Sequence, residues 1–286
     1  MTTSSHKVCV VMPVYNGAGT IRRAIRSLQL QTYANWACVI VDDGSTDDTA
    51  AILDRIEDPR FRIIHLEANR GRGYARKTAI ANADGEYLAY LDADDFIHPD
   101  KLRLQIERFR SDPELDLVGC GALMLDRRLQ PLNRSANTRS IKALYRDGDS
   151  LPTVMAAVMV RTELARNIEY NTALDVGEDI DYFSRYLDGR YYANIPDAMY
   201  YYDLGMTSSM KIMRYTAHDI KRGWYQFRRT PVAGLKIMLF DILKLFVYGC
   251  TLPVLGSGFF IARRGVPANP SEIEAFRTTL AAIEQK

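Results

Sequence analysis

Three carboxylates follow an apolar run at residues 87–95, Tyr-Leu-Ala-Tyr-Leu-Asp-Ala-Asp-Asp. Because an unpaired charge is costly to bury, we expect Asp92, Asp94 and Asp95 at the end of a core strand, at the mouth of a cleft. Carboxylates this close repel one another, and oxygen ligands that leave room for phosphates are a usual way to hold Mg²⁺ or Mn²⁺. The spacing therefore predicts a divalent-metal site, although a strand followed by an acidic helix cap would use the same residue types.

The elements around this run alternate between strands and helices. Near-continuous apolar runs at residues 7–14, 36–41, 61–66 and 87–91 indicate buried strands, and helical spacing or helix start signals follow them. Such alternation implies an α/β fold with a mostly parallel sheet flanked by helices, in which ligands bind beyond the carboxyl ends of the strands. The polar residues at these predicted ends are Tyr15, Asn16, Asp42, Asp43 and Asp92–Asp95.

The rest of the chain is less regular and ends in a helical segment. Ser45 and Asp48 are spaced as a capping box, which predicts the start of a helix after the second strand. We divide the chain into an α/β domain at residues 1–210 and a basic and apolar C-terminal segment at residues 211–286. The further predicted elements are a strand at 115–125, a helix at 178–187, strands at 190–195 and 198–202, a basic aromatic helix at 216–230, and apolar segments at 235–248 and 250–262.

Charge is distributed unevenly along the chain. The 286 residues are 47% apolar and carry a net charge of +2, so no global field points to nucleic acid. Residues 1–210 hold 25 Lys and Arg against 30 Asp and Glu, whereas residues 211–264 hold 10 against 2. This asymmetry suggests an anionic partner for the C-terminal segment.

Several classes of protein are not indicated. The four cysteines form no Cys-X-X-Cys pair, so neither a zinc site nor a disulfide framework is expected. The run Gly71–Arg76 breaks the Gly-X-Gly-X-X-Gly pattern at its last position, and neither a P-loop nor a Gly-X-Ser-X-Gly motif is present. The polar N-terminus leads directly into a strand and shows no signal peptide, which predicts a cytoplasmic location.

The ordered motifs together resemble glycosyltransferase family 2, a group of inverting enzymes with the GT-A fold. The resemblance covers roughly residues 7–210, and six motifs in order are far more specific than any one of them. The motifs are Pro13-Val14-Tyr15-Asn16, Val41–Asp47, Asn69-Arg70-Gly71 with Ala75-Arg76, Asp84–Tyr87, Leu91–Asp95 with Pro99, and Gly177-Glu178-Asp179.

The resemblance implies a nucleotide site at the first two strand ends. Pro13, Tyr15 and Asn16 would form the floor under the nucleotide. Asp43, together with Asp42, would accept a hydrogen bond from the N3–H of a uracil, which favours a UDP-linked donor. Without the resemblance, Asp42 and Asp43 could equally be a strand end and a helix cap.

The resemblance also implies a site for the diphosphate and its metal. Arg76 would approach phosphate or ribose. Asp92 and Asp94 would hold Mn²⁺ or Mg²⁺ together with the sugar-nucleotide, with Asp95 close by. The metal would bridge the diphosphate and offset the charge that develops on the leaving group.

The last matching motif would supply the catalytic base. Asp179, next to Glu178, would remove a proton from the acceptor hydroxyl. In-line attack would then invert the anomeric centre through an oxocarbenium-like state. The alternative is that both residues are solvated acids in the first turn of a helix, where the helix dipole favours them.

The segment after the last predicted strand departs from the family. Many members have Tyr-Arg-X-His there, which helps to hold the diphosphate, whereas this chain has Tyr202-Asp203-Leu204-Gly205. We expect Lys211 or Arg214, in the basic segment that follows, to supply the missing positive charge. An inactive or strictly regulated transferase would show the same departure.

The C-terminal segment lies outside the firm resemblance. Basic and aromatic residues mix at residues 221–229, and two apolar pieces follow. This composition suits a segment that lies on an anionic membrane surface, beside a lipid-linked acceptor. Asp241, Lys244 and Pro253 interrupt the roughly 20 apolar residues that a transmembrane span needs. The alternatives are an ordinary pair of packing helices or a dimer interface.

These features predict a metal-dependent inverting glycosyltransferase. It would move a sugar from a nucleotide-sugar donor to a saccharide or lipid-linked saccharide, in cell-surface polysaccharide biosynthesis, from the cytoplasm or the inner face of the membrane. Two alternatives remain open at this point. One is a non-catalytic module that binds sugar-nucleotide or saccharide on the same fold, and the other is a nucleotidyltransferase.

Overall fold

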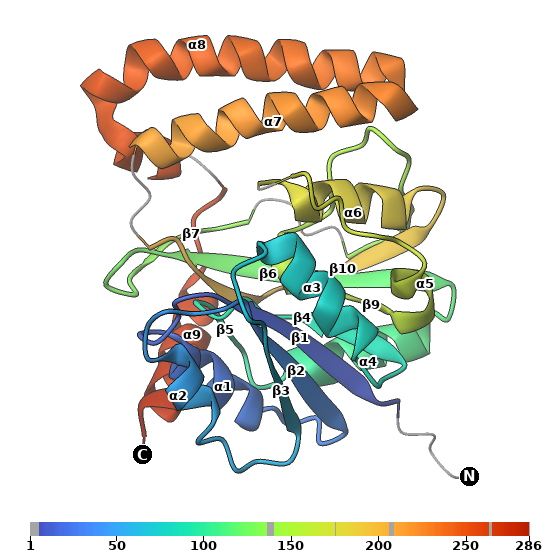
Figure 1. The fold of residues 1–286 in the computed structure, drawn as a ribbon, viewed down its shortest axis with the longest axis vertical. Helices are drawn as coiled ribbons and strands as arrows, with labels where there is room; N and C mark the ends of the chain where they lie inside the picture. The colour runs from blue at the N-terminus through green and yellow to red at the C-terminus, as the bar shows by residue number, and fades with distance from the viewer. Residues whose placement is uncertain (1–5, 136–139, 175, 206–208, 263–264, 286) are drawn as a thin grey trace.

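The computed structural model describes residues 6–135, 140–174, 176–205, 209–262 and 265–285. The side chains of residues 209–212, 254–255 and 257–262 lie outside this description. Figure 1 shows a sheet covered by helices, with a long helical hairpin on one side of the molecule and the C-terminal helix on the other.

A single mixed sheet forms the centre of the protein. Its strand order is β3-β2-β1-β4-β9-β6-β10-β5, with β7 paired to β6 and β8 paired to β10. The pairs β1–β2, β2–β3, β1–β4 and β6–β10 are parallel, while β9 runs antiparallel between β4 and β6. The strands are β1 (Val8–Val14), β2 (Trp36–Asp42), β3 (Phe61–His65), β4 (Tyr87–Tyr90), β5 (Phe96–Ile97), β6 (Leu115–Leu125), β7 (Pro131–Arg134), β8 (Ala143–Leu144), β9 (Met159–Arg161) and β10 (Tyr191–Asp203).

Two helical layers cover this sheet. The helices are α1 (Ile21–Gln29), α2 (Thr49–Leu53), α3 (Arg72–Ala81), α4 (Lys101–Ser111), α5 (Thr162–Arg166), α6 (Glu178–Leu187), α7 (Ser209–Arg229), α8 (Pro231–Ala262) and α9 (Pro270–Glu284), with a 3₁₀ turn, η1, at Met155–Ala157. Helices α1 and α4 pack in one apolar cluster, and α3 and α6 pack in a second. The predicted α/β fold with a mostly parallel, helix-flanked sheet is confirmed.

The strand register brings three polar chain segments to one edge of the sheet. Every residue of β1 is buried, as expected for a continuous apolar strand at the centre of a sheet. Val14 pairs with Asp42 of β2, and the Leu91 amide, just after β4, donates to Val11 of β1. The residues that follow these three strands therefore lie next to one another.

Two local predictions differ from the structure. The Ser45 side chain makes no capping box, because its Oγ accepts a hydrogen bond of 2.9 Å from the Asn16 amide; α2 begins instead at Thr49. The two strands predicted at 190–195 and 198–202 form the continuous β10, with irregular pairing to β6 between Ile195 and Ala198.

The C-terminal part of the chain consists of a hairpin and a separate helix. Helices α7 and α8 run side by side, and α8 is interrupted at Gly256, where φ is 70°. The two helices approach so closely that a Cβ on Gly234 would lie 2.2 Å from the Phe227 backbone nitrogen. Helix α9 lies apart from them, and its Phe276 packs with Phe96 and Tyr201 of the sheet.

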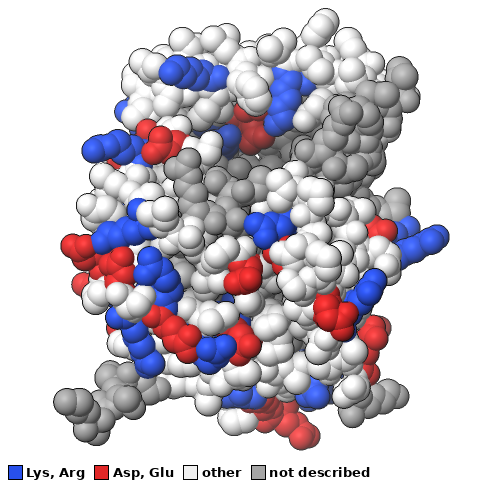
Figure 2. All heavy atoms as spheres, turned by 180° about the vertical axis from the view of Figure 1, so that it is seen from behind, with Lys and Arg blue, Asp and Glu red and all other residues white. Residues whose placement is uncertain are grey.

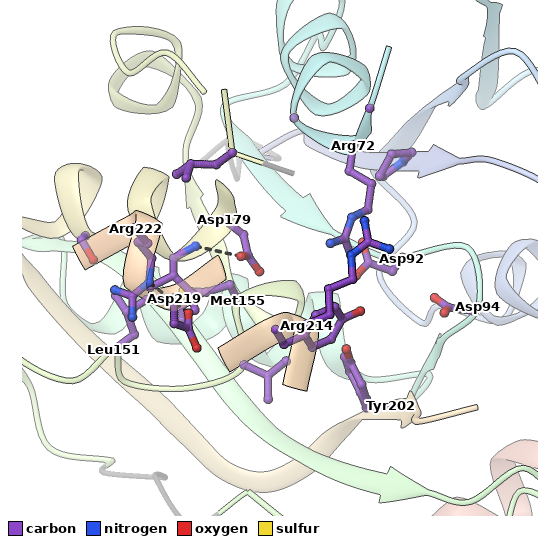
Figure 3. A pocket seen from close by; sticks show the side chains of 18 of the residues that line it. Arg72, Asp92, Asp94, Leu151, Met155, Asp179, Tyr202, Arg214, Asp219 and Arg222 are labelled. Carbon is purple, nitrogen blue, oxygen red and sulfur yellow. Dashed lines mark hydrogen bonds and ion pairs between the residues drawn. The ribbon is translucent and has the colours of Figure 1, made fainter. Parts of the chain in front are cut away.

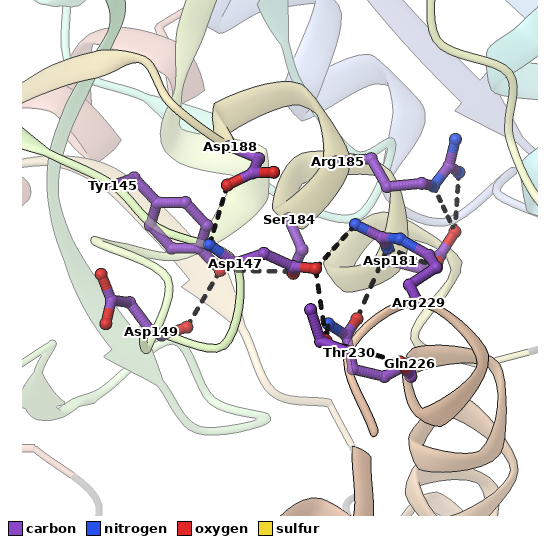
Figure 4. Close-up of polar contacts among 10 residues, drawn as sticks. All are labelled: Tyr145, Asp147, Asp149, Asp181, Ser184, Arg185, Asp188, Gln226, Arg229 and Thr230. Carbon is purple, nitrogen blue, oxygen red and sulfur yellow. Dashed lines mark hydrogen bonds and ion pairs between the residues drawn. The ribbon is translucent and has the colours of Figure 1, made fainter. Parts of the chain in front are cut away.

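Polar contacts tie the hairpin to the α/β body at both ends. Near the turn between α7 and α8, Arg229 lies 3.0 Å from Asp147 and 3.8 Å from Asp181 (Figure 4). On the far side, Val266 forms a bridge with Arg134, beside β6. Figure 2 shows that both signs of charge are mixed over the body, while the hairpin, at the top, is largely uncharged with some basic side chains.

Candidate active site

A cavity of about 1,560 Å³ lies at the carboxyl ends of β1, β2 and β4. Its walls come from these strand ends, the start of α3, the start of α6, and the facing sides of α7 and α8. Figure 3 shows side chains from the body and from the hairpin pointing into the same space. The C-terminal segment is thus part of the cavity wall.

The predicted nucleotide floor lines this cavity. Pro13, Tyr15 and Asn16 all face it, and Tyr15 is 46% exposed. Asn16 adopts a left-handed conformation with φ of 52°, and its Oδ1 accepts from the Thr46 amide at 2.8 Å. These bonds hold the turn after β1 against the turn after β2.

The two carboxylates at the end of β2 have different surroundings. Asp43 lines the cavity and accepts hydrogen bonds of 2.8 Å from the backbone amides of Arg70 and Gly71. Asp42 is buried beneath it and contacts the Ser45 amide and His65 Nδ1. Of the predicted pair, Asp43 is therefore the residue at the cavity, and Asp42 stabilises the turn.

Arg76 is buried beside the cavity and is not among the residues that line it. Its Nη1 donates to Glu178 Oε1 at 2.7 Å and its Nη2 to Asp92 Oδ1 at 2.8 Å, and the residue is 5% exposed. Burial alone would lower the pKa of Arg76, but the neighbouring carboxylates, Asp92 first, hold it well above its usual value. Arg76 therefore joins two motifs of the site, those of Asp92 and Glu178.

The three carboxylates after β4 are also divided between the cavity and the interior. Asp92 and Asp94 line the cavity. Asp95 is 1% exposed, and its carboxylate accepts from Tyr200 Oη at 2.6 Å and from the Asp203 amide at 2.8 Å. Burial, with Asp94 and Asp92 nearby, raises the pKa of Asp95 well above its usual range. The Asp95 side chain thus anchors β10, and it does not line the cavity where a metal ligand was predicted.

These residues fit a divalent metal held together with phosphates. Asp92 and Asp94 present hard oxygen donors at the cavity surface, and Arg76 contacts Oδ1 of Asp92. Mg²⁺ and similar ions commonly bind one or two carboxylates and take their remaining ligands from water and substrate phosphate. Within the part of the chain that the structure describes, no group of three or more acidic, histidine or cysteine side chains could hold a metal alone.

The predicted base motif begins α6. Gly177 precedes the helix with φ of 75°, a conformation that favours glycine. Glu178 turns inward, and burial, followed by the nearby Asp179 carboxylate, raises its pKa. Asp179 faces the cavity. Of the two residues predicted as catalytic, Asp179 can reach a substrate in the cavity, whereas Glu178 positions Arg76.

Positive charge reaches the cavity from two elements. Arg214, on α7, lines it, and Figure 3 shows this side chain close to Arg72 and Asp92. The side chain of Lys211, the other predicted cation, lies outside the described residues. Arg72, on α3, has a half-exposed side chain 3.5 Å from Glu178.

Sequence reasoning missed Arg72 and a second arginine, Arg222. Arg72 stands four residues before Arg76, so the helical repeat places both on the same face of α3. That spacing could have indicated its position. Arg222 pairs with Asp219 at 3.3 Å and packs beside Gly177, which brings α7 to the start of α6. No local pattern indicated this contact.

Comparisons with known proteins agree on the class of enzyme. The family model described as glycosyl transferase family 2 matches residues 9–163. The succinoglycan biosynthesis protein ExoO of Rhizobium meliloti (strain 1021) is 48% identical over 101 residues, which span 35% of this chain and 29% of that protein. The UDP-Glc:alpha-D-GlcNAc-diphosphoundecaprenol beta-1,3-glucosyltransferase WfgD of Escherichia coli is 39% identical over 99 residues, 35% of this chain and 39% of that protein.

Solved structures show the same fold over nearly the whole chain. The S. aureus TarS 1–349 structure in complex with UDP aligns with a TM-score of 0.63 at 20% identity, covering 97% of this chain and 80% of that one. The mannosyltransferase PcManGT from Pyrobaculum calidifontis, in complex with GDP-Man and Mn²⁺, aligns with a TM-score of 0.61 at 18% identity, covering 98% and 86%. The family match spans more than half of the chain, and the fold and motif order agree with it: the chain belongs to glycosyltransferase family 2 and has the GT-A fold.

Proposed function

We propose that this protein is a metal-dependent inverting glycosyltransferase that uses a nucleotide-sugar donor, UDP-linked, in cell-surface polysaccharide biosynthesis. The observation that carries the proposal is the meeting of Asp43, Asp92, Asp94 and Asp179 at one cavity. Asp92 and Asp94 suit a metal with phosphates, and Asp43 suits a nucleobase that has a ring N–H donor. Asp179 suits an acceptor hydroxyl. A purely structural role for the strand ends would not require all four to face the same space.

The donor would lie across the ends of β1, β2 and β4. Tyr15 and Asn16 would support the nucleotide from below. Asp43 is already fixed by two backbone amides, so its carboxylate is pre-oriented toward the N3–H of a uracil. The UDP in the TarS complex and the UDP-Glc in the name of WfgD support this choice of nucleotide.

Asp92 and Asp94 would hold Mn²⁺ or Mg²⁺ against the diphosphate, where the bound ion offsets negative charge on the leaving group. The Mn²⁺ in the PcManGT complex supports this assignment. Arg72 and Arg214 would add positive charge beside the same phosphates. They would take over from the Tyr-Arg-X-His motif that this chain lacks, because β10 ends in Tyr202-Asp203 with no basic residue at that point.

Asp179 would act as the general base. It faces the cavity at the first turn of α6, where an acceptor hydroxyl could approach the donor from the side opposite the leaving group. Removing the proton from that hydroxyl makes it a better nucleophile, and attack from that side inverts the anomeric carbon. Glu178 and Arg76 would hold the start of α6 in place relative to Asp92.

The acceptor would be a saccharide, free or lipid-linked. The part of the cavity toward the hairpin is lined by apolar residues that include Leu151, Met155 of η1 and Ile237 of α8. WfgD, by its name, acts on a diphosphoundecaprenol-linked sugar, which supports a lipid-linked acceptor and a place of action at the inner face of the membrane.

The first test is calorimetric titration of UDP and GDP into the purified protein, with and without Mn²⁺. We expect UDP to bind more tightly when Mn²⁺ is present, and we expect Asp94→Asn to remove that metal dependence. The matched control is Asp84→Asn, an exposed carboxylate distant from the cavity. A folded protein that binds neither nucleotide would overturn the proposal.

Reaction products separate the proposal from the two alternatives. A transferase releases UDP from a UDP-sugar when acceptor is present, whereas a nucleotidyltransferase releases pyrophosphate. A non-catalytic module would bind UDP without turnover with any acceptor, and Asp179→Asn would change nothing measurable.

A further inference from the structure

One side of α8 is apolar and exposed. Seven residues on it are between 42% and 70% exposed, and they recur at helical spacing along four turns. We call this surface the outer apolar face. It consists of Val232, Leu235, Leu239, Ile242, Leu243, Phe246 and Val247.

The opposite side of α8 faces the protein. Ile237, Lys244 and Tyr248 line the cavity, and Asp241 is 4% exposed with Lys244 at 3.5 Å. Figure 1 shows α8 on the outside of the hairpin, with α7 running between it and the body. Helix α8 is thus apolar over most of its circumference, and its paired polar side chains, Asp241 and Lys244, lie on the side toward the protein. Among the described residues, no helix is both long and apolar enough to cross a bilayer.

The charge of the hairpin favours an anionic partner. Residues 211–264 carry ten Lys and Arg but two acids, Asp219 and Asp241, and each of these acids is paired with a basic side chain inside the hairpin. Exposed Lys236 lies on the same helix as the outer apolar face, and Arg228 stacks over the exposed Trp224 ring at 5.4 Å. A basic residue on the same helix as an apolar stripe, with further basic and aromatic side chains exposed on the neighbouring helix, suits anionic headgroups above an acyl layer.

A second copy of the chain is a poorer partner for this surface. Pairing two such faces would bring the exposed Lys236 side chains of both copies together, and like charges at an interface oppose association. No acidic residue lies within the stretch 220–240 to offset them. An anionic bilayer offsets the same charge and also covers the apolar side chains.

We propose that the outer apolar face of α8 docks on the surface of an anionic lipid bilayer. The ion pair of Arg229 with Asp147 joins the hairpin to the body, so docking would also set the direction in which the cavity faces. Because α8 has one side on lipid and the other on the cavity, a saccharide attached to a membrane lipid reaches Asp179 without leaving the bilayer surface. This second consequence rests on the proposed function, whereas docking itself does not.

The test is flotation of the full chain with vesicles, in the absence of nucleotide. We expect binding to vesicles that contain phosphatidylglycerol at low salt, and much weaker binding to vesicles of phosphatidylcholine alone. The double variant Leu243→Glu/Phe246→Glu, whose residues do not line the cavity, should lower the partition coefficient by at least about tenfold. Lys236→Glu should lower it by about fivefold or more, and this loss should shrink at high salt.

The matched control is Ile141→Glu, which places the same charge on an exposed apolar residue of the body, 79% exposed. It should bind vesicles as the unaltered protein does. Equal vesicle binding by all variants would overturn the proposal, as would a dimer in solution that Leu243→Glu/Phe246→Glu converts to a monomer while vesicles fail to bind. UDP affinity measured on the same variants distinguishes failure of the docking proposal from failure of the proposed function, because a loss of docking should leave UDP affinity unchanged.

Discussion

Arg76 and Glu178 form a buried ion pair beneath the cavity, with Nη1 of Arg76 2.7 Å from Oε1 of Glu178. The two residues are 102 positions apart in the chain, and they join α3 to the start of α6. The base candidate Asp179 follows Glu178 directly. The position of Asp179 relative to Asp92 thus depends on one guanidinium group.

We expect Arg76→Met to destabilise the protein by about 3 kcal/mol, because it leaves the buried Glu178 with only the more distant, half-exposed Arg72 as a cationic neighbour. Urea unfolding followed by circular dichroism measures this change. The control is Lys77→Met on the exposed side of the same helix, where the ion pair with Glu169 is solvent-exposed and adds little. Equal stability of the two variants would show that the buried pair does not support the fold.

Asp179→Asn should lower kcat by about 10²- to 10⁴-fold, because the amide cannot accept the proton of the acceptor hydroxyl. The dissociation constant for UDP should stay nearly unchanged, since Asp179 does not belong to the donor end of the cavity. Initial rates of UDP release, together with calorimetry, measure the two effects separately. Glu163→Gln, an exposed acid in the first turn of α5, is the control. Unaltered turnover in Asp179→Asn would remove this residue from the mechanism.

Arg72→Met should weaken binding of UDP by about tenfold while leaving uridine binding unchanged, because a charge-assisted contact to phosphate is absent in the nucleoside. Calorimetric titration with both ligands measures the difference. Arg62→Met, at an exposed position on β3, should alter neither affinity. A parallel loss for UDP and uridine would indicate that Arg72 shapes the pocket and does not contact the diphosphate.

The stability of the protein should fall as pH rises above the usual pKa of histidine, 6.5, through a contribution from His65. Burial alone would lower the pKa of His65, but hydrogen bonds with Asp42 and Asp54 raise it overall. A raised pKa in the folded state adds stability that is complete below the unfolded pKa and is lost as pH passes the folded pKa.

Urea unfolding at about pH 5.5 and about pH 8.5 tests this contribution. The free energy of unfolding should fall more between the two values in the unaltered protein than in His65→Gln. Asp54→Asn, which removes one of the two acceptors, should give an intermediate difference. Identical pH dependence of all three proteins would contradict the prediction.

The strand ends of the site could be predicted because the signal is local. An apolar run that stops at a carboxylate identifies both the strand and its end, and this was sufficient for Asp43, Asp92 and Asp94. That only one of Asp42 and Asp43 lines the cavity could also have been predicted, because successive side chains at the end of a strand point to opposite faces. Only one of the two could face the cavity.

The remaining parts of the site depend on contacts between distant segments. Nothing near Arg76 indicates that Glu178 will neutralise it, and nothing near Asp95 indicates that Tyr200 will donate to it. The capping box expected at Ser45 was wrong for the same reason: the turn after β1 offers the Ser45 hydroxyl a backbone amide, that of Asn16. Contacts between distant segments determine the hydrogen-bond partners of such polar side chains, and local spacing does not reveal those contacts.

The route of the chain through the hairpin has a consequence for how the enzyme could diversify. The chain leaves the body where the Leu204 amide donates to Leu125, and it returns where Val266 meets Arg134 on the neighbouring β7. The chain thus departs from β10 and returns beside β7, two strands that both pair with β6, and every strand that the structure describes is complete without the residues between them. Helices α7 and α8 are an insertion between two strands: their sequence can change the wall of the cavity opposite the sheet while β1, β2 and β4, which position Asp43, Asp92 and Asp94, stay as they are.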